Sequence, residues 1–144
     1  MFSKIAVALN ELPESQRALR TAIEFARASN AELATVSILE DLPAYASFAI
    51  FVDPSAPNVM KEERRRAHRE LHEKASLLAL EHGVRAKGSI VEGQEVHAIL
   101  HFLKVENADL LVIGLHQHDF YLSRLWSSVY DLAHEAPCSV LGVH

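Results

Sequence analysis

The chain has 144 residues, of which 49% are hydrophobic and 23% charged, a composition typical of one globular domain. Its formal net charge of −5 argues against nucleic-acid binding, which needs clustered Lys and Arg to displace counterions from the phosphates. The single cysteine excludes an intramolecular disulfide, and no apolar run approaches the roughly 20 residues that cross a bilayer.

Five short apolar runs have the pattern of buried strands. They cover residues 5–9, 33–39, 84–91, 110–113 and 138–143. Such near-continuous runs are typical of parallel strands that are covered by helices on both faces. Lys4 leads directly into the first run with no signal-peptide cleavage site, so we expect a cytoplasmic protein without a membrane partner.

Helical patterns fill the intervals between these runs, over residues 14–29, 60–82, 94–107 and about 126–135. Within the third, Val96, Ile99, Leu100 and Leu103 follow the spacing of a helix with one face on the core. The alternation of strand and helix predicts an α/β fold, a doubly wound parallel sheet with right-handed crossovers. No linker or repeat divides the chain, so we expect one domain over residues 1–144.

The one long irregular stretch covers residues 40–58. It contains three prolines and the aromatic residues Tyr45, Phe48 and Phe51. Irregular segments of this length in compact domains tend to be lids, interfaces or mobile segments. The aromatics indicate packing against the domain or against a partner, and the sequence leaves both open.

The histidines and the basic run do not predict a metal or nucleic-acid site. His68 and His72 are four residues apart, as are His97 and His101, but neither pair is completed by further zinc ligands. We therefore expect surface histidines. Residues 64–66 are three arginines, and we expect them on a solvated helix face where Glu62 pairs with Arg66.

Several segments resemble the universal stress protein family. They are residues 4–10, 91–93, 108–114, 127–129 and 136–141, together with the small and apolar positions Ser15, Ala18, Leu19 and Ala22. The resemblance covers essentially the whole chain. It implies an adenine nucleotide alpha hydrolase-like fold, with five parallel strands in the order 3-2-1-4-5 and helices on both faces. It also implies a homodimer joined through the C-terminal strand.

The implied strand order places a topological switch point between the first and fourth strands, where ligands of open α/β sheets bind. Asn10 and Gly114 would then line one crevice. The seven candidate cofactor-binding residues are Asn10, Ile38, Ile113, Gly114, Gln117, Ser127 and Ser128. His116 and His118 follow Gly114 and could also face this crevice.

ATP-binding members of the family resemble one another in a signature of three glycines followed by Ser or Thr. In this chain Gly114 matches the first glycine and Ser128 the closing residue, whereas Gln117 and Ser127 replace the other two glycines. Asn10 replaces the acidic residue of the nucleotide-binding members, and Asp119 would repel phosphate. These departures predict a degenerate nucleotide crevice, so that ATP or another adenosine nucleotide remains open as a ligand and no cofactor is certain.

No complete set of nucleophile, base and orienting residue is visible, so we expect no catalytic residue and no enzyme. Ser127 and Ser128 are better explained as caps of the last helix than as nucleophiles. We therefore expect a regulator of the universal stress protein type that acts by binding a small molecule or a partner. The alternative is an ATP- or AMP-binding member whose loop tolerates the substitutions.

Overall fold

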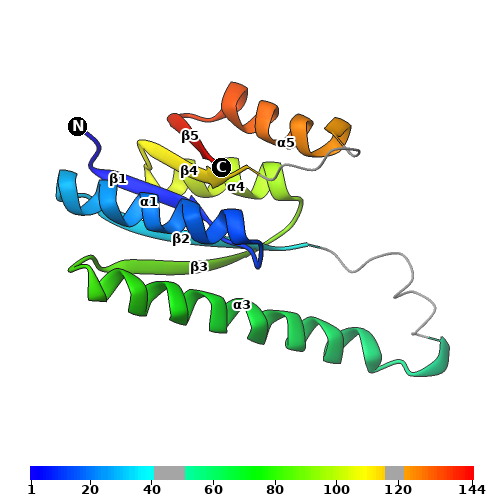
Figure 1. The fold of residues 1–144 in the computed structure, drawn as a ribbon. Coiled ribbons are helices and arrows are strands. Elements are labelled where there is room, and N and C mark those ends of the chain that lie inside the picture. The colour runs from blue at the N-terminus through cyan, green and yellow to red at the C-terminus, as the bar shows by residue number, and fades with distance from the viewer. Residues whose placement is uncertain (41–50, 116–121) are drawn as a thin grey trace.

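The computed structural model describes residues 1–40, 51–115 and 122–144, with the backbone alone for residues 122–128. The strands are β1 (Lys4–Ala8), β2 (Glu32–Leu39), β3 (Ala86–Glu92), β4 (Leu110–Gly114) and β5 (Ser139–Val143). The helices are α1 (Pro13–Ser29), α3 (Ala56–Glu81), α4 (Glu95–Glu106) and α5 (Leu122–Glu135). Figure 1 shows their order along the chain.

The five strands form one parallel sheet in the order β3-β2-β1-β4-β5, which confirms the order that the family resemblance implied. The β1 strand is central, with Val7 beside Thr35 of β2 on one side and beside Val112 of β4 on the other. The chain crosses from β3 over to β4, on the far side of β1. The topological switch point therefore lies between β1 and β4.

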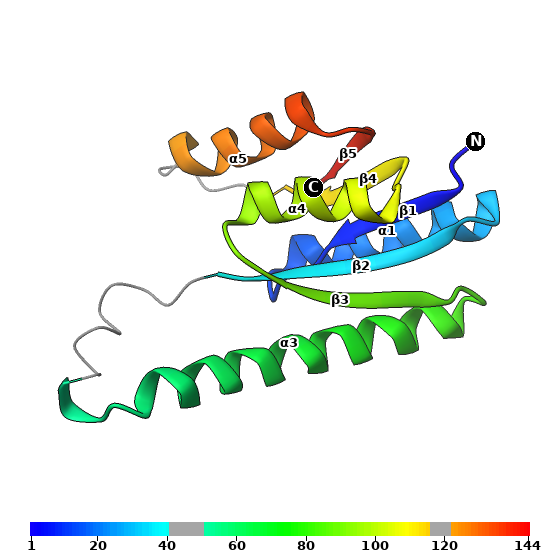
Figure 2. The ribbon, with the colours of Figure 1, turned by 180° about the vertical axis from the view of Figure 1, so that it is seen from behind.

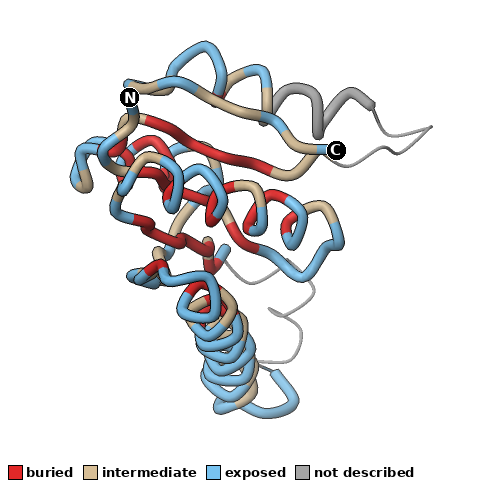
Figure 3. The backbone as a smooth tube through the Cα atoms, turned by 60° about the vertical axis from the view of Figure 1, so that its left-hand side comes forward, coloured by how far each residue is buried: buried red, intermediate tan, exposed pale blue. Residues whose placement is uncertain are grey.

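Two helical layers cover the sheet, with α1 and α3 on one face and α4 and α5 on the other (Figures 1 and 2). Alternate residues of each strand point to opposite layers. Ile5 and Val7 of β1 pack with Leu19 and Ile23 of α1, whereas Ala6 belongs to the core under α4. Buried residues are concentrated in the central strands and the helix faces on them (Figure 3).

Two helices begin earlier than the sequence pattern predicted. α3 starts at Ala56 instead of residue 60, and Pro57 lies in its first turn, where a missing backbone N–H costs no hydrogen bond. α5 starts at Leu122 instead of about Trp126. Ser127 and Ser128 therefore lie inside the helix and are not its caps, which corrects the expectation drawn from their residue type.

The described residues contain no helix long and apolar enough to cross a membrane. Of the aromatics in the long irregular segment, Phe51 is 89% exposed, and Tyr45 and Phe48 lie outside the described residues.

Candidate functional site

Asn10 and Gly114 lie at the same, carboxyl edge of the sheet. Gly114 is the last residue of β4, and Asn10 follows β1, which is the neighbouring strand. Both residues meet the first turn of α1: the Asn10 N–H donates to Ser15 Oγ at 2.9 Å, and Gly114 packs against Glu14 and Ser15. The predicted proximity of these two residues is confirmed.

Gly114 is required by the packing of α1. A Cβ at this position would come within 2.5 Å of the Glu14 carbonyl carbon and 2.8 Å of the Ser15 nitrogen. Backbone atoms of a helix cannot move aside as a flexible side chain can. The glycine thus lets the start of α1 lie directly over the end of β4, which brings the helix N-terminus to the carboxyl edge of the sheet.

The side chain of Asn10 has a defined orientation. Its Oδ1 accepts a hydrogen bond of 2.9 Å from the Leu12 N–H, so that the amide group caps the turn before α1. The Nδ2 donors of this exposed residue have no partner among the described residues. Asn10 therefore offers hydrogen-bond donors at the edge, in contrast to the acceptor that an acidic residue would offer.

The remaining candidate residues divide into two groups. Ile113 is buried under α4 and α5, and Ile38 is half-buried on the same face, so both contribute apolar surface on that side of the sheet. Gln117, His116, His118 and Asp119 lie outside the described residues. Ser127 and Ser128 belong to α5 by their backbone, and their side chains also lie outside the described part.

The prediction of surface histidines is wrong for His72. Its side chain is only 8% exposed, and His68 is half-buried, whereas His97 and His101 are exposed as expected. The reason is that His72 lies on the face of α3 that covers β2. Thr35 and Ser37 alternate with apolar residues in β2, and these two polar positions on one strand face were the overlooked signal.

A continuous chain of hydrogen bonds links these polar groups. The Thr35 hydroxyl is 2.8 Å from His72 Nδ1, and Ser37 Oγ is 2.8 Å from both His72 Nε2 and His68 Nδ1. Gly88 of β3 leaves room for the imidazole, because a Cβ there would lie 2.9 Å from His72 Nδ1. Burial, with a smaller effect of the neighbouring His68, lowers the pKa of His72 to about 4.

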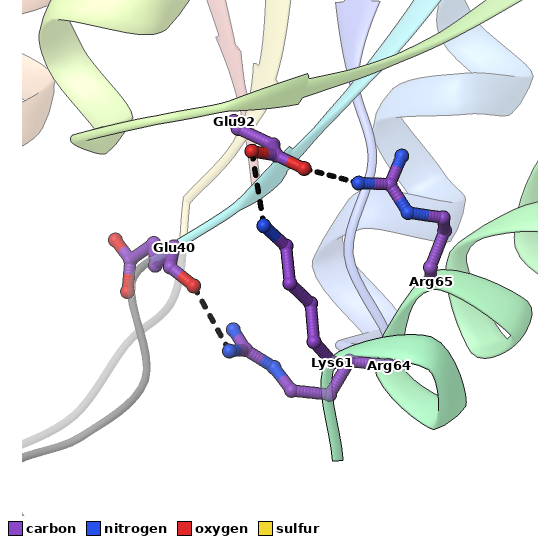
Figure 4. A network of polar contacts seen from close by, with 5 residues as sticks. All are labelled: Glu40, Lys61, Arg64, Arg65 and Glu92. Carbon is purple, nitrogen blue, oxygen red and sulfur yellow. Dashed lines mark hydrogen bonds and ion pairs between the residues drawn. The ribbon is translucent and has the colours of Figure 1, made fainter. Parts of the chain in front are cut away.

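A basic network extends from α3 to the carboxyl ends of β2 and β3 (Figure 4). Glu92, at the end of β3, forms an ion pair with Arg65 and a second ion pair, of 3.2 Å, with Lys61. Arg64 donates to the Glu40 carbonyl oxygen at 2.9 Å. Glu62 pairs with Arg69 at 2.9 Å and forms no ion pair with Arg66, so the expected Glu62–Arg66 pair is wrong.

No group of three or more His, Cys, Asp or Glu side chains in the described part of the chain is arranged to hold a metal ion.

Comparison with known proteins identifies relatives of the whole chain. The model of the universal stress protein family matches residues 1–144. Universal stress protein A homolog 1 of Coxiella burnetii is 28% identical over 144 residues, which cover 99% of this chain and 96% of the relative.

Solved structures share the fold. Universal stress protein UspA from Lactobacillus plantarum aligns with a TM-score of 0.83 at 20% identity, over 99% of this chain and 97% of that protein. A universal stress protein in complex with cAMP aligns with a TM-score of 0.70 at 23% identity, over 99% and 97% of the two chains.

Proposed function

The chain belongs to the universal stress protein family, and on that premise we propose that it is a binding regulator that takes an adenosine nucleotide at the carboxyl edge between β1 and β4. Occupancy of this crevice would shift its conformation or its assembly with a partner, without a chemical step. The neighbour in complex with cAMP supports an adenosine monophosphate as the class of ligand.

The observation that carries the proposal is the meeting of Asn10 and Gly114 around the first turn of α1. The helix begins without a side-chain cap, so the positive end of its dipole lies at this edge and favours an anion. Asn10 adds hydrogen-bond donors beside this end. Together these groups suit a ligand that has both ring or ribose acceptors and a phosphate.

The changes in the loop favour a monophosphate over a triphosphate. Gln117 replaces a glycine, and a residue with a Cβ costs about 1–2 kcal/mol where the loop needs a positive φ. Ser127 and Ser128 lie inside α5, whose interior N–H groups bond within the helix and cannot close around a phosphate. Asp119 adds a negative charge to the same loop.

Binding without catalysis is the better interpretation of the polar groups. Ser37 contacts two imidazoles, as an activated nucleophile would, but its side chain is 1% exposed and no substrate could reach it. His68 and His72 are hydrogen-bond partners of Ser37 inside the fold.

The proposal includes a homodimer through β5. This strand pairs with β4 on one side, and its other edge is apolar and has no partner in the described part of the chain. Gly142, expected to let a partner backbone approach, also has a role within the chain: a Cβ there would come 2.7 Å from Leu115 Cδ1.

Calorimetric titration with AMP tests the proposed site. Asn10→Ala should lower AMP affinity about tenfold, because the variant loses a donor in the crevice. Asn107→Ala, at the exposed C-cap of α4, is the matched control and should bind like the unmodified protein. For ATP, a variant with Gln117→Gly, Ser127→Gly and Asp119→Gly should bind more tightly than the unmodified chain. Equal AMP binding by Asn10→Ala, or no AMP binding at all, would reject the site.

A further inference from the structure

The residues of α3 that face the sheet change along the helix from basic side chains at its N-terminal end to histidines and then to alanines. At about 100° per residue, they form one stripe along the helix. From the exposed to the buried end they are Lys61, Arg64, Arg65, His68, His72, Ala75 and Ala79. The buried alanines and His72 cover β2 and β3. The N-terminal half of α3 continues past the ends of these strands (Figure 1), so the basic members lie at the carboxyl edge.

The buried hydrogen bonds determine which ring nitrogen of each histidine in this stripe carries the proton. Thr35 is fully buried, and its hydroxyl has no acceptor other than His72 Nδ1 among the described residues. Neutral His72 then carries its proton on Nε2 and donates to Ser37 Oγ. The single Ser37 hydroxyl proton is donated in turn to His68 Nδ1.

His68 is consequently held as the tautomer that carries its proton on Nε2. This outer N–H has no hydrogen-bond acceptor among the described residues. Burial and the charge of Arg64 lower the pKa of His68, while Glu11 in the turn after β1 opposes this. The imidazole is therefore a neutral donor between α3 and the end of β1, the strand that Asn10 follows.

The neighbouring cations differ in how they are compensated. Lys61 and Arg65 share the single carboxylate of Glu92, which fixes both side chains at the end of β3. Arg64 makes only a hydrogen bond to the Glu40 carbonyl oxygen, and no carboxylate in the described part of the chain pairs with it. Its guanidinium keeps four further N–H donors, one turn of helix from His68.

We infer that Arg64 and His68 form an anion subsite on the α3 side of the carboxyl edge, which accepts oxygens of a phosphate group. In this inference, which rests on the proposed nucleotide binding, the phosphate of the nucleotide is held by α3 in place of the altered β4 loop. The groups that face His68 are Ser37 of β2, Glu11 of the β1–α1 turn, and Arg64, Arg65 and His72 of α3. Among these groups Arg64 is the cation that no carboxylate in the described part of the chain pairs with, and this favours an anionic ligand.

Binding of AMP, adenosine and inorganic phosphate to four single variants tests the subsite. Arg64→Gln and His68→Asn should each lower AMP affinity about tenfold while adenosine affinity stays within about twofold. Asn reproduces the inner His nitrogen at Ser37 but not the outer donor. His68→Gln, which places an amide nitrogen at the outer position, should recover most of the AMP affinity. Arg66→Gln, on the exposed side of the same helix, is the control and should change nothing.

A nuclear magnetic resonance readout separates this inference from the proposed function. Long-range ¹H–¹⁵N correlations at pH 7 should show His68 protonated at Nε2, and inorganic phosphate should shift this signal. A phosphate shift without AMP binding would support the subsite and reject the proposed nucleotide function. AMP binding that Arg64→Gln and His68→Asn leave unchanged would reject the subsite and retain the function. A His68 protonated at Nδ1, or one unaffected by phosphate, would also overturn the subsite.

Discussion

Gly114 lies against the backbone of Glu14, so closely that a Cβ on the glycine would come within 2.5 Å of the Glu14 carbonyl carbon. The end of β4 and the start of α1 are thereby locked together. The family signature assigns this glycine to the nucleotide loop, but in this fold it also sets where the helix begins. One residue thus determines the packing of α1 at the edge where we propose the binding site.

Gly114→Ala should therefore destabilise the fold. We expect a loss of about 1–3 kcal/mol in the free energy of unfolding, because helix backbone must move to admit the methyl group. Gly142→Ala is the matched control, since its Cβ would meet only the end of the Leu115 side chain at 2.7 Å. Urea unfolding measures both variants, and equal stability losses would contradict this role of Gly114.

The buried His72 should make stability depend on pH in the acidic range. Its pKa is about 4 in the folded protein, below the unfolded value near 6.5, so the unfolded chain binds more protons between these limits. Stability is then lost as the pH falls from about 6.5 toward 4. From pH 7.5 to 5 we expect His72 to contribute a loss of about 2 kcal/mol, and His72→Gln should remove this contribution. An identical pH dependence of the two proteins would contradict this assignment.

The Thr35 hydroxyl should contribute to the stability of the fold only while His72 is present. Thr35→Val removes the hydroxyl and leaves the buried His72 Nδ1 without its donor, which should cost about 1–3 kcal/mol of stability. In a His72→Leu background the same substitution should cost under about 0.5 kcal/mol, because no polar atom is then left unsatisfied. A double-mutant cycle by chemical denaturation measures this coupling, and additive effects would argue against the hydrogen bond.

The order of elements was predictable because each apolar run here has the length and period of one element, and the strand order came from the resemblance to the universal stress protein family. The edge that holds Asn10 and Gly114 follows from that order. The burial of His72 was not predicted, since the i, i+4 spacing of His68 and His72 is equally typical of a solvated face. The polar residues Thr35 and Ser37 in a buried strand were the available signal, and only the register of α3 on β2 joins them to the histidines.

The first residue of α5 was also predicted wrongly from the sequence, for a different reason. Ser127 and Ser128 are good capping residues, and a helix that begins near them fits the sequence. The apolar spacing of Leu122, Leu125 and Val129 continues the helix a further turn toward the N-terminus, and this longer helix is the one formed. A strong local capping signal was therefore outweighed by the extent of the amphipathic pattern.

If the protein dimerises through β5, a substitution that removes a backbone donor from the outer edge of this strand should dissociate the dimer. Ser139 N and Val143 O bond toward β4, so the backbone groups of Val140 point away from the sheet. Val140→Pro should remove an outward donor and yield monomers, while the unmodified protein sediments at twice its 16.0 kDa chain mass. Val105→Lys, on exposed α4 surface, should leave the dimer intact. An unmodified protein that stays monomeric at micromolar concentration would contradict the dimer.

Affinities of the unmodified protein for AMP and ATP, measured side by side by calorimetry, test the central claim most directly. The proposed site, with donors of Asn10 beside the positive end of α1 but with Gln117 in its loop, should bind AMP at least about tenfold more tightly than ATP, a difference of about 1.4 kcal/mol. Micromolar ATP affinity equal to or tighter than that for AMP would contradict the account.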